Sequence, residues 1–344
     1  MNGRYAHRGL PPVQFEIDGY DTEGTMMFTF EGLYTPVITP MGVDGEIDYP
    51  RFKSQLDLLV AEGVHGIIVG GTTGESYAMS QAERMETIRF ASGVLKDRLP
   101  LIAGVGTIRT EDGIELATAA RESGADALLL GSPAYACPTE EENAMHALAI
   151  ADAADLPVML YNYPGRSGST MGKTYLDIVT TDARFCAIKE SSGDINAMHR
   201  IAADYPSLQL SCGADDQALE FFAWGARSWV CGGSNFLPKE HAALYEACAI
   251  RNDFNRGRQI MRILLPLMRM LEQGGKFVQS IKNGCEWAGM AAGPVRRPLQ
   301  DLSEATRVEQ ITLLDGLRVK MDEILASFAS EDQQRVSSRV SGYA

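Results

Sequence analysis

Eight short apolar runs recur from residue 33 onward, and they lack the alternation of apolar and polar residues that marks a half-exposed strand. They are rich in Val, Ile, Leu and Cys, as expected for strands buried on both faces of a parallel sheet. The runs are LYTPVIT from Leu33, GIIVGG from Gly66, PLIAGVG from Pro100, ALLLGSP from Ala127, PVMLYNYP from Pro157, FCAIKES from Phe185, LQLSCGA from Leu208 and SWVCGGS from Ser228.

Amphipathic segments separate many of these runs and predict helices. Their apolar residues recur three and four positions apart, in residues 49–62, 81–95, 110–123, 140–153 and 195–204. Strands that alternate with helices in this way predict an α/β fold, a closed (β/α)8 TIM barrel. A doubly wound open sheet is the alternative. It normally begins with a glycine-rich phosphate loop, but the G-x-G at Gly104 and Gly106 lacks a third glycine.

The chain divides into four parts on this pattern. Residues 1–31 have no periodicity and are interpreted as an N-terminal extension. The barrel occupies residues 32–252. Residues 253–330 form a C-terminal helical domain, with helices expected over 254–272, 276–290 and 303–328, and residues 331–344 form a disordered tail.

Composition and charge exclude several classes of protein. The chain of 344 residues has 31 basic and 45 acidic residues, and a net charge of −14 disfavours binding to nucleic acid or to anionic membranes. No apolar stretch is long enough to span a membrane and no secretory signal is recognisable, so a cytoplasmic protein is expected. The five histidines and six cysteines lack the spacing of ligands, so no metal is expected.

Lys189 is the most unusual residue at the predicted strand ends, where barrel enzymes place their active sites. It closes the apolar strand that begins at Phe185. Burial disfavours a charged amine and lowers its pKa, and a neutral amine can attack a ketone to form a Schiff base. The alternative is a lysine that reaches water or pairs with Glu190.

Other strand ends carry polar groups whose roles the residues alone leave open. The strand-2 loop offers Thr72 and Thr73 among glycines, which suits a small anion but is also typical of a turn. Tyr161 is either a core aromatic residue or a proton relay. Arg166 is either a surface ion-pair residue or a clamp for a carboxylate. Asp215 and Asp216 suggest a metal pair, although a cap for the following helix is the favoured interpretation.

Four motifs together resemble one family. GGTTGES, YNYPGRSG, IKESSGD and GPVRRPL are similar, in order and spacing, to the dihydrodipicolinate synthase/N-acetylneuraminate lyase superfamily. The resemblance extends from about Leu33 to about residue 325. It implies a class I lyase or synthase that holds pyruvate or another 2-oxo acid as a covalent Schiff base, without a further cofactor.

The resemblance also implies a role for each matching residue. Lys189 matches the Schiff-base lysine and Tyr161 the tyrosine that shuttles protons, while Thr72 matches its hydrogen-bond partner. Tyr135 matches the tyrosine that completes the relay in a neighbouring subunit, which implies a homodimer or homotetramer. The substrate-binding positions are Thr73 for the keto-acid carboxylate, Arg166 for the carboxylate of an aldehyde partner, and Val230 for a main-chain carbonyl.

The second substrate is less well defined by the resemblance. Synthases commonly read Pro-Tyr-Tyr-Asn where this chain has Pro133 to Ala136, and they carry an Asn-Pro pair near KFVQSIK. Condensation of pyruvate with aspartate semialdehyde is placed first. The alternatives are aldolase or dehydratase action on a 2-keto-3-deoxy sugar acid, deamination of a hydroxy-pyrroline carboxylate, or a non-catalytic barrel that binds a keto acid.

Feedback inhibition by lysine is not expected. In lysine-inhibited members of the family the inhibitor sits in a polar pocket at the dimer interface, whose positions are here Gln81, Arg84, Ile108, Asp112 and Ala134. Ile108 and Ala134 offer no hydrogen bonds to a zwitterion, and an unpaired polar group costs about 1 to 3 kcal/mol.

Overall fold

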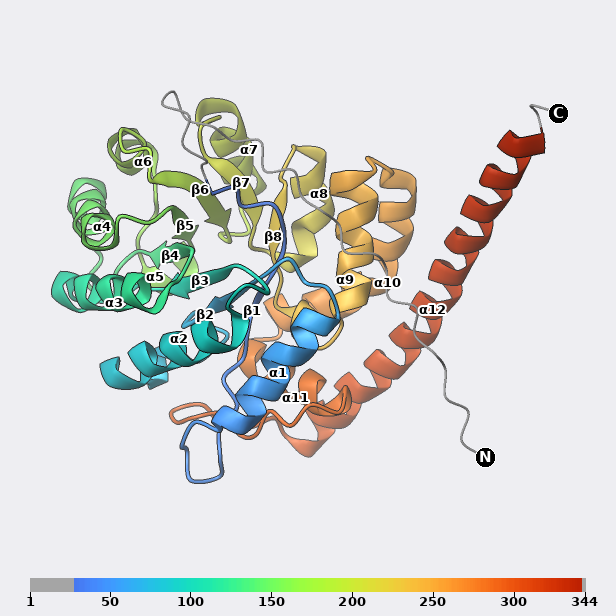
Figure 1. The fold of residues 1–344 in the computed structure, drawn as a ribbon, viewed down its shortest axis with the longest axis horizontal. Helices are drawn as coiled ribbons and strands as arrows, with labels where there is room; N and C mark the ends of the chain where they lie inside the picture. Colours follow the sequence, from blue (N-terminus) through green and yellow to red (C-terminus); the bar gives the residue numbers. More distant parts are fainter. Residues whose placement is uncertain (1–27, 342–344) are drawn as a thin grey trace.

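Eight parallel strands close into a barrel in the computed structural model, which describes residues 28–341 (Figure 1). The strands follow one another around the barrel in chain order, and β1 pairs with both β2 and β8. The predicted TIM barrel is therefore confirmed. The strands are β1 (Gly32–Pro36), β2 (Gly66–Val69), β3 (Leu101–Gly104), β4 (Ala127–Gly131), β5 (Val158–Asn162), β6 (Phe185–Glu190), β7 (Gln209–Cys212) and β8 (Ser228–Val230).

The inside of the barrel is filled by side chains from alternate strand positions. Tyr34, Ile68, Ile102 and Met159 belong to this inner cluster, and Phe30 packs against it from the segment before β1. A second, larger apolar cluster lies between the strands and the surrounding helices. Both faces of each strand are thus buried, which explains why the apolar runs show no alternation.

Helices follow the strands and cover the outside of the barrel. The structure adds helices after β5, β7 and β8 that the apolar pattern did not indicate. The helices around the barrel are α1 (Tyr49–Ala61), α2 (Gln81–Leu95), α3 (Thr110–Ser123), α4 (Glu140–Ala154), α5 (Pro164–Ser167), α6 (Lys173–Val179), α7 (Ile195–Asp204), α8 (Ala218–Ala223) and α9 (Pro238–Tyr245), with short 3₁₀ turns over Ser76–Ala78, Asp215–Gln217 and Gly233–Asn235 and a π-helical turn over Glu246–Ile250.

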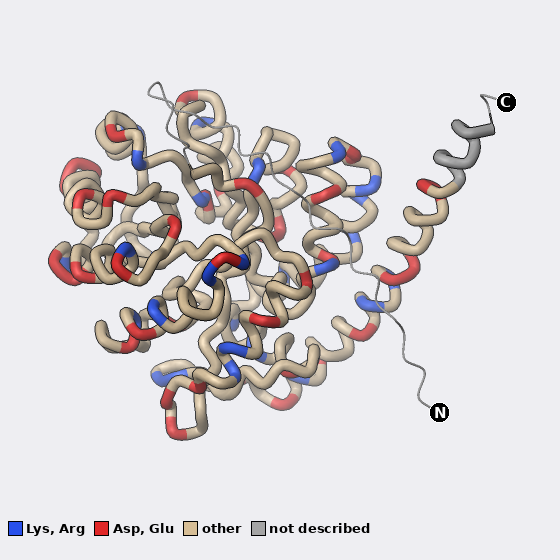
Figure 2. Tube along the Cα trace, viewed as in Figure 1, with Lys and Arg blue, Asp and Glu red and all other residues tan. Residues whose placement is uncertain are grey.

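Acidic residues are spread over these outer helices, with Lys and Arg among them (Figure 2). The excess of acidic charge therefore lies across the surface of the fold. Within residues 28–341, no helix has the length and apolar character needed to cross a membrane.

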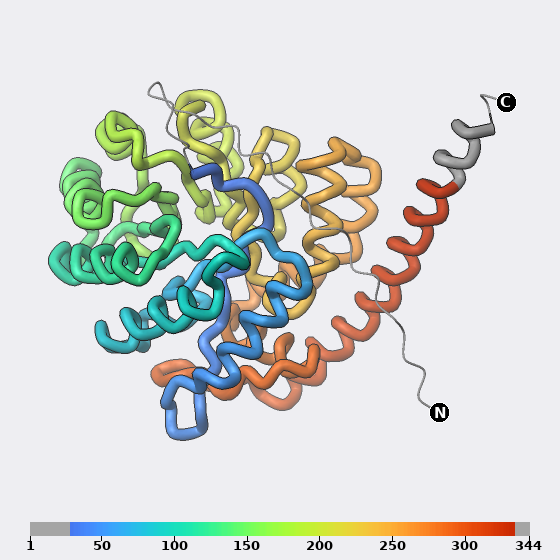
Figure 3. Tube along the Cα trace, in the orientation of Figure 1, coloured from blue at the N-terminus to red at the C-terminus, as the bar shows by residue number. Residues whose placement is uncertain are grey.

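Three helices form the C-terminal part of the chain: α10 (Phe254–Gln273), α11 (Phe277–Trp287) and α12 (Glu304–Ser341). The tail expected to be disordered from residue 331 is instead helical to Ser341, and residues 342–344 lie outside the described residues, as do residues 1–27 of the N-terminal extension. The segment between α11 and α12 runs beside the loop after β1 (Figure 3), where the Met41 N–H donates to the Ala292 carbonyl. The C-terminal part thus packs directly on the barrel.

Arg256 of α10 holds the distal part of α12 in place. The Arg256 guanidinium donates to both carboxylate oxygens of Asp332, at 2.7 and 2.9 Å, and lies 4.7 Å from the ring centroid of Phe328. Phe328 is itself buried. A bidentate ion pair and a cation–π contact together explain why the helix stays docked as far as Asp332.

Replacement of Phe328 by Ala should release this end of α12 while the barrel stays folded. Loss of a buried phenylalanine costs about 3 kcal/mol, which corresponds to roughly a hundredfold faster amide exchange. Hydrogen–deuterium exchange should show this change in residues 320–333 and not in the strands. Val319→Ala is the matched control, because Val319 is 58% exposed. Equal exchange in the two variants would contradict the docking role of Phe328.

Candidate active site

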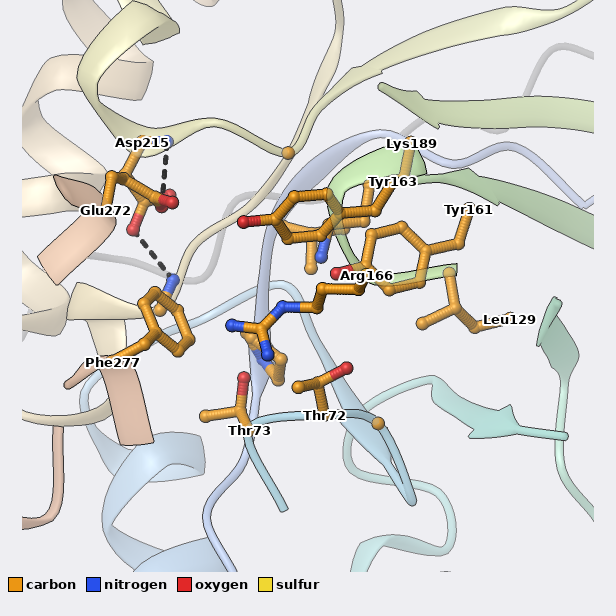
Figure 4. Close-up of a pocket in the computed structure, with 15 residues that line it drawn as sticks. Thr72, Thr73, Leu129, Tyr161, Tyr163, Arg166, Lys189, Asp215, Glu272 and Phe277 are labelled. Carbon is orange, nitrogen blue, oxygen red and sulfur yellow. Dashed lines mark hydrogen bonds between the residues drawn. The ribbon is translucent and has the colours of Figure 1, made fainter. Parts of the chain in front are cut away.

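A pocket opens at the C-terminal ends of the strands, and residues from the barrel and from α10 and α11 line it (Figure 4). Six of the seven site residues predicted from the sequence line this pocket: Thr72, Thr73, Tyr161, Arg166, Lys189 and Val230. The other lining residues are Pro36, Gly71, Leu129, Tyr163, Gly213, Asp215, Gly232, Glu272 and Phe277.

The register of two neighbouring strands brings Lys189 and Tyr161 together. They are direct partners in the β5–β6 pairing, so both side chains point into the barrel mouth. The Lys189 amine lies 4.1 Å from the centroid of the Tyr161 ring. Gly213 makes room for the lysine, since a Cβ at residue 213 would lie 2.7 Å from the Cγ of Lys189.

Burial is the main influence on the Lys189 amine. It lowers the pKa of Lys189 to about 8, although the negative charges of Asp215 and Glu272 oppose this change. Lys189 is 8% exposed, so few water molecules are available to stabilise its charge. The amine therefore has a substantial neutral fraction near pH 8 and can act as a nucleophile.

Tyr161 combines a buried position with hydrogen bonds to two hydroxyl groups. Burial raises the pKa of its phenol to about 12, and hydrogen bonds with Thr72 and Ser191 act in the opposite direction. The phenol is thus protonated at neutral pH and lies beside the lysine. This arrangement suits a group that gives up and recovers a proton during a reaction.

The strand-2 loop holds Thr72 and Thr73 through a tight backbone turn. Gly70 has a φ of 75°, and a Cβ there would lie 3.1 Å from the carbonyl oxygen of Gly104. The Glu75 N–H donates to the Thr72 carbonyl at 3.0 Å. The turn therefore presents both threonines at the pocket wall.

A buried ion pair supports the same loop from the C-terminal helices. The carboxylate of Glu75, which has a φ of 60°, lies 2.5 Å from the Lys282 amine of α11, and both side chains are almost fully buried. The other carboxylate oxygen of Glu75 accepts from the Arg296 N–H at 2.8 Å. The Arg296 side chain also donates to the carbonyls of Gly45 and Ala78. The motif GPVRRPL thus joins the strand-2 loop to α11.

Arg166 lies on the short helix α5 and is the most exposed cation in the pocket. Its guanidinium lies 5.2 Å from the ring centroid of Tyr163. In the described part of the chain, no carboxylate lies within ion-pair distance of it. The guanidinium is therefore available to a carboxylate on a ligand.

Two carboxyl groups in the pocket were missed or misread in the sequence. Asp215 neither caps a helix nor pairs with Asp216. Its carboxylate accepts from the Trp229 indole at 2.8 Å and from the Gly232 N–H at 3.0 Å, and its own N–H donates to Glu272 at 3.4 Å. Within residues 28–341, no cluster of three or more His, Cys, Asp and Glu side chains is arranged to hold a metal ion.

Glu272 had a recognisable signal in the sequence. It stands four residues after Met268 and eight after Leu264, on the apolar face of α10, where a carboxyl group is unexpected. Desolvation and the neighbouring Asp215 raise the pKa of Glu272 well above its usual range, and desolvation also raises the pKa of Asp215.

Tyr135 is the predicted site residue that does not line the pocket of its own chain. It is 93% exposed and has a φ of 69°, a left-handed conformation that is uncommon for a tyrosine. The backbone therefore holds this side chain out from the surface. Arg84, one of the positions compared with the lysine pocket, turns inward and donates to the carbonyls of Gly104 and Gly106. The expected insensitivity to lysine stays a prediction.

Comparison with known proteins identifies the family. A model described as "Dihydrodipicolinate synthetase family" matches residues 29–316. The chain belongs to this family. It is 35% identical over 277 residues to the 4-hydroxy-tetrahydrodipicolinate synthase of Exiguobacterium sibiricum, covering 80% of this chain and 94% of that protein.

Solved structures of the dihydrodipicolinate synthetase family have the same fold. The 4-hydroxy-tetrahydrodipicolinate synthase from Methylacidiphilum fumariolicum SolV has a TM-score of 0.81 and 28% identity, over 87% of this chain and 99% of that chain. The chloride-inhibited dihydrodipicolinate synthase from Acinetobacter baumannii, complexed with pyruvate, has a TM-score of 0.76 and 28% identity, over 84% and 99%. The family resemblance inferred from the sequence motifs is confirmed.

Replacement of Lys282 by Met should destabilise this member of the family strongly. The change leaves the Glu75 carboxylate buried without its partner, which costs about 3 to 5 kcal/mol. Urea unfolding followed by circular dichroism measures the change in free energy. The control is Lys239→Met, since Lys239 pairs with Glu62 on the surface and exposed pairs contribute at most about 1 kcal/mol. Similar stabilities of the two variants would contradict a supporting role for the buried pair.

Proposed function

We propose that this chain is a Schiff-base-forming 4-hydroxy-tetrahydrodipicolinate synthase, which condenses pyruvate with aspartate semialdehyde. The observation that carries the proposal is the buried Lys189 amine, whose pKa is lowered to about 8 beside the Tyr161 phenol. The names of the matched relatives, and the pyruvate bound in the Acinetobacter baumannii enzyme, support the same reaction.

The first half-reaction places pyruvate on Lys189. The neutral amine attacks the keto carbon, and loss of water gives an iminium ion. Thr73 and the carbonyl of Val230 lie at the wall that would face the keto acid. Tyr161 and Thr72 pass protons to and from the adduct, which becomes an enamine. Lys189 itself supplies the covalent bond, so this chemistry requires no cofactor.

The second half-reaction joins the enamine to the aldehyde. The enamine carbon attacks the aldehyde carbon, while Arg166 at the pocket wall holds the carboxylate of that substrate. The substrate amine then replaces Lys189 at the former keto carbon, which releases the lysine and closes the ring.

An alternative function retains Lys189 and Tyr161 but acts on a sugar-derived or hydroxyproline-derived 2-oxo acid. Ala134 favours this alternative, because synthases commonly carry Tyr at that position.

Reduction with borohydride in the presence of pyruvate tests the proposal directly. A mass increase is expected on the peptide that contains Lys189. The rate of this labelling should rise from pH 7 to pH 9, because a larger fraction of the Lys189 amine is then neutral and nucleophilic. Lys189→Ala should neither trap pyruvate nor turn over. Lys173→Ala, which removes an exposed lysine, and Tyr161→Phe should both still trap it. Label on another lysine, or no label, would refute the Schiff-base proposal.

The proposed working unit is at least a dimer, in which Tyr135 of one subunit completes the site of the other. Mixing of Tyr135→Ala and Lys189→Ala subunits, after dissociation, should then restore activity, because a mixed dimer regains one complete site. At equal amounts the expected activity is about a quarter of that of the unmodified protein. Activity that stays at the level of the separate variants would place Tyr135 outside the neighbouring site.

A further inference from the structure

Glu272 occupies a position in the pocket that no structural requirement explains. It lies in the last turn of α10, where the partial negative charge of the helix end disfavours a carboxylate. Its neighbours along the same face, such as Leu264 and Met268, are fully buried apolar residues. The Glu272 carboxylate accepts a long hydrogen bond, of 3.4 Å, from the Asp215 N–H. A carboxyl group retained under such conditions indicates a function.

The charges around Glu272 come from two neighbouring elements. Asp215 and Asp216 face it from the turn after β7, and Lys189 faces it from β6, while its own charge acts in turn on Tyr161. Desolvation and Asp215 raise the pKa of Glu272 well above its usual range. Its carboxyl group therefore exchanges its proton closer to neutral pH than an ordinary glutamate does, which suits a group that accepts and returns protons.

The position of Glu272 complements that of Arg166. Asp215, Glu272 and Phe277 form one wall of the pocket, and Leu129 and Tyr161 form the opposite wall (Figure 4). The Arg166 guanidinium lies between these walls, on the side of Thr72 and Thr73 (Figure 4). A substrate whose carboxylate binds Arg166 therefore has the Glu272 carboxyl within the same pocket, as a partner for a cationic group.

We propose that Glu272 binds the ammonium group of the second substrate and removes its protons for the exchange that releases Lys189. This inference rests on the proposed function and adds to it the residue that handles the amine of the second substrate. It assigns to Glu272 a task separate from that of Tyr161, which serves the keto-acid adduct.

The substrate amine replaces the Lys189 amine on the adduct carbon through a series of proton transfers. The Glu272 carboxylate takes one proton from the ammonium group, and the freed electron pair forms a bond to the iminium carbon on Lys189. A second proton leaves the substrate nitrogen, while the lysine nitrogen receives one. The bond between carbon and the lysine nitrogen then breaks and its electron pair returns to Lys189, while the electron pair of the substrate nitrogen forms the new C=N bond. The remaining proton stays on Glu272 until solvent takes it.

Glu272→Gln keeps the shape of the side chain and removes its basicity. With pyruvate and aspartate semialdehyde, kcat should fall by about a hundredfold or more, and the limb of the pH profile that belongs to Glu272 should disappear. Borohydride should still trap pyruvate on Lys189 in this variant, because the keto acid requires only the lysine amine to form the adduct. The variant should unfold at the same or a higher temperature than the unmodified protein, because an unfavourable carboxylate has been removed.

Succinate semialdehyde separates the two steps, since it has the aldehyde and the carboxylate but no amine. Its addition to the enamine on Lys189, without borohydride, should be equally fast in Glu272→Gln and in the unmodified protein. Glu309→Gln is the matched control and should retain its turnover, because Glu309 is an exposed carboxyl on α12 that does not line the pocket. Equal losses on both aldehydes, a normal kcat in Glu272→Gln, or an unchanged pH profile would each overturn the role of Glu272.

The same experiments distinguish this inference from the proposed function. If the unmodified protein does not trap pyruvate on Lys189, both proposals are wrong. If it traps pyruvate but does not turn over aspartate semialdehyde, the assignment of Glu272 to an amine is wrong while the Schiff-base mechanism stands.

Discussion

The structure depends on one geometric constraint, the alternation of side chains along strands that are buried on both faces. Ala187 points into the barrel, so Lys189, two residues further on, must do so too. The parallel register then fixes its neighbours, which are Tyr161 on β5 and Ser211 on β7. An amine in this position is separated from most water, and the lowered pKa follows from the fold itself.

The helices after the barrel complete this site. Glu272 and Phe277 form part of the pocket wall, and Lys282 holds Glu75 beneath the strand-2 loop. These contacts join residues more than fifty positions apart in the chain. The last helices are therefore part of the active site. The barrel supplies the nucleophile, and α10 and α11 shape the space around it.

The sequence was sufficient for the elements with a strong local signal. The apolar runs predicted the barrel, and the strand-end motifs predicted six residues that meet in one pocket. It was insufficient where the signal is tertiary. Asp215 resembles a helix cap in the sequence, but its carboxylate is buried beneath the indole of Trp229. The length of α12 escaped prediction because Arg256, far away in the chain, anchors its distal part.

The dependence of the pocket on α10 and α11 has a consequence for the order in which the protein matures. Synthesis proceeds from the N-terminus, and the strands that carry Tyr161 and Lys189 emerge from the ribosome well before residues 272–282. A nascent chain that has already closed β1 against β8 still lacks one wall of its pocket. Competence for catalysis is therefore acquired late, when the last quarter of the chain docks on a barrel whose reactive amine is already in place.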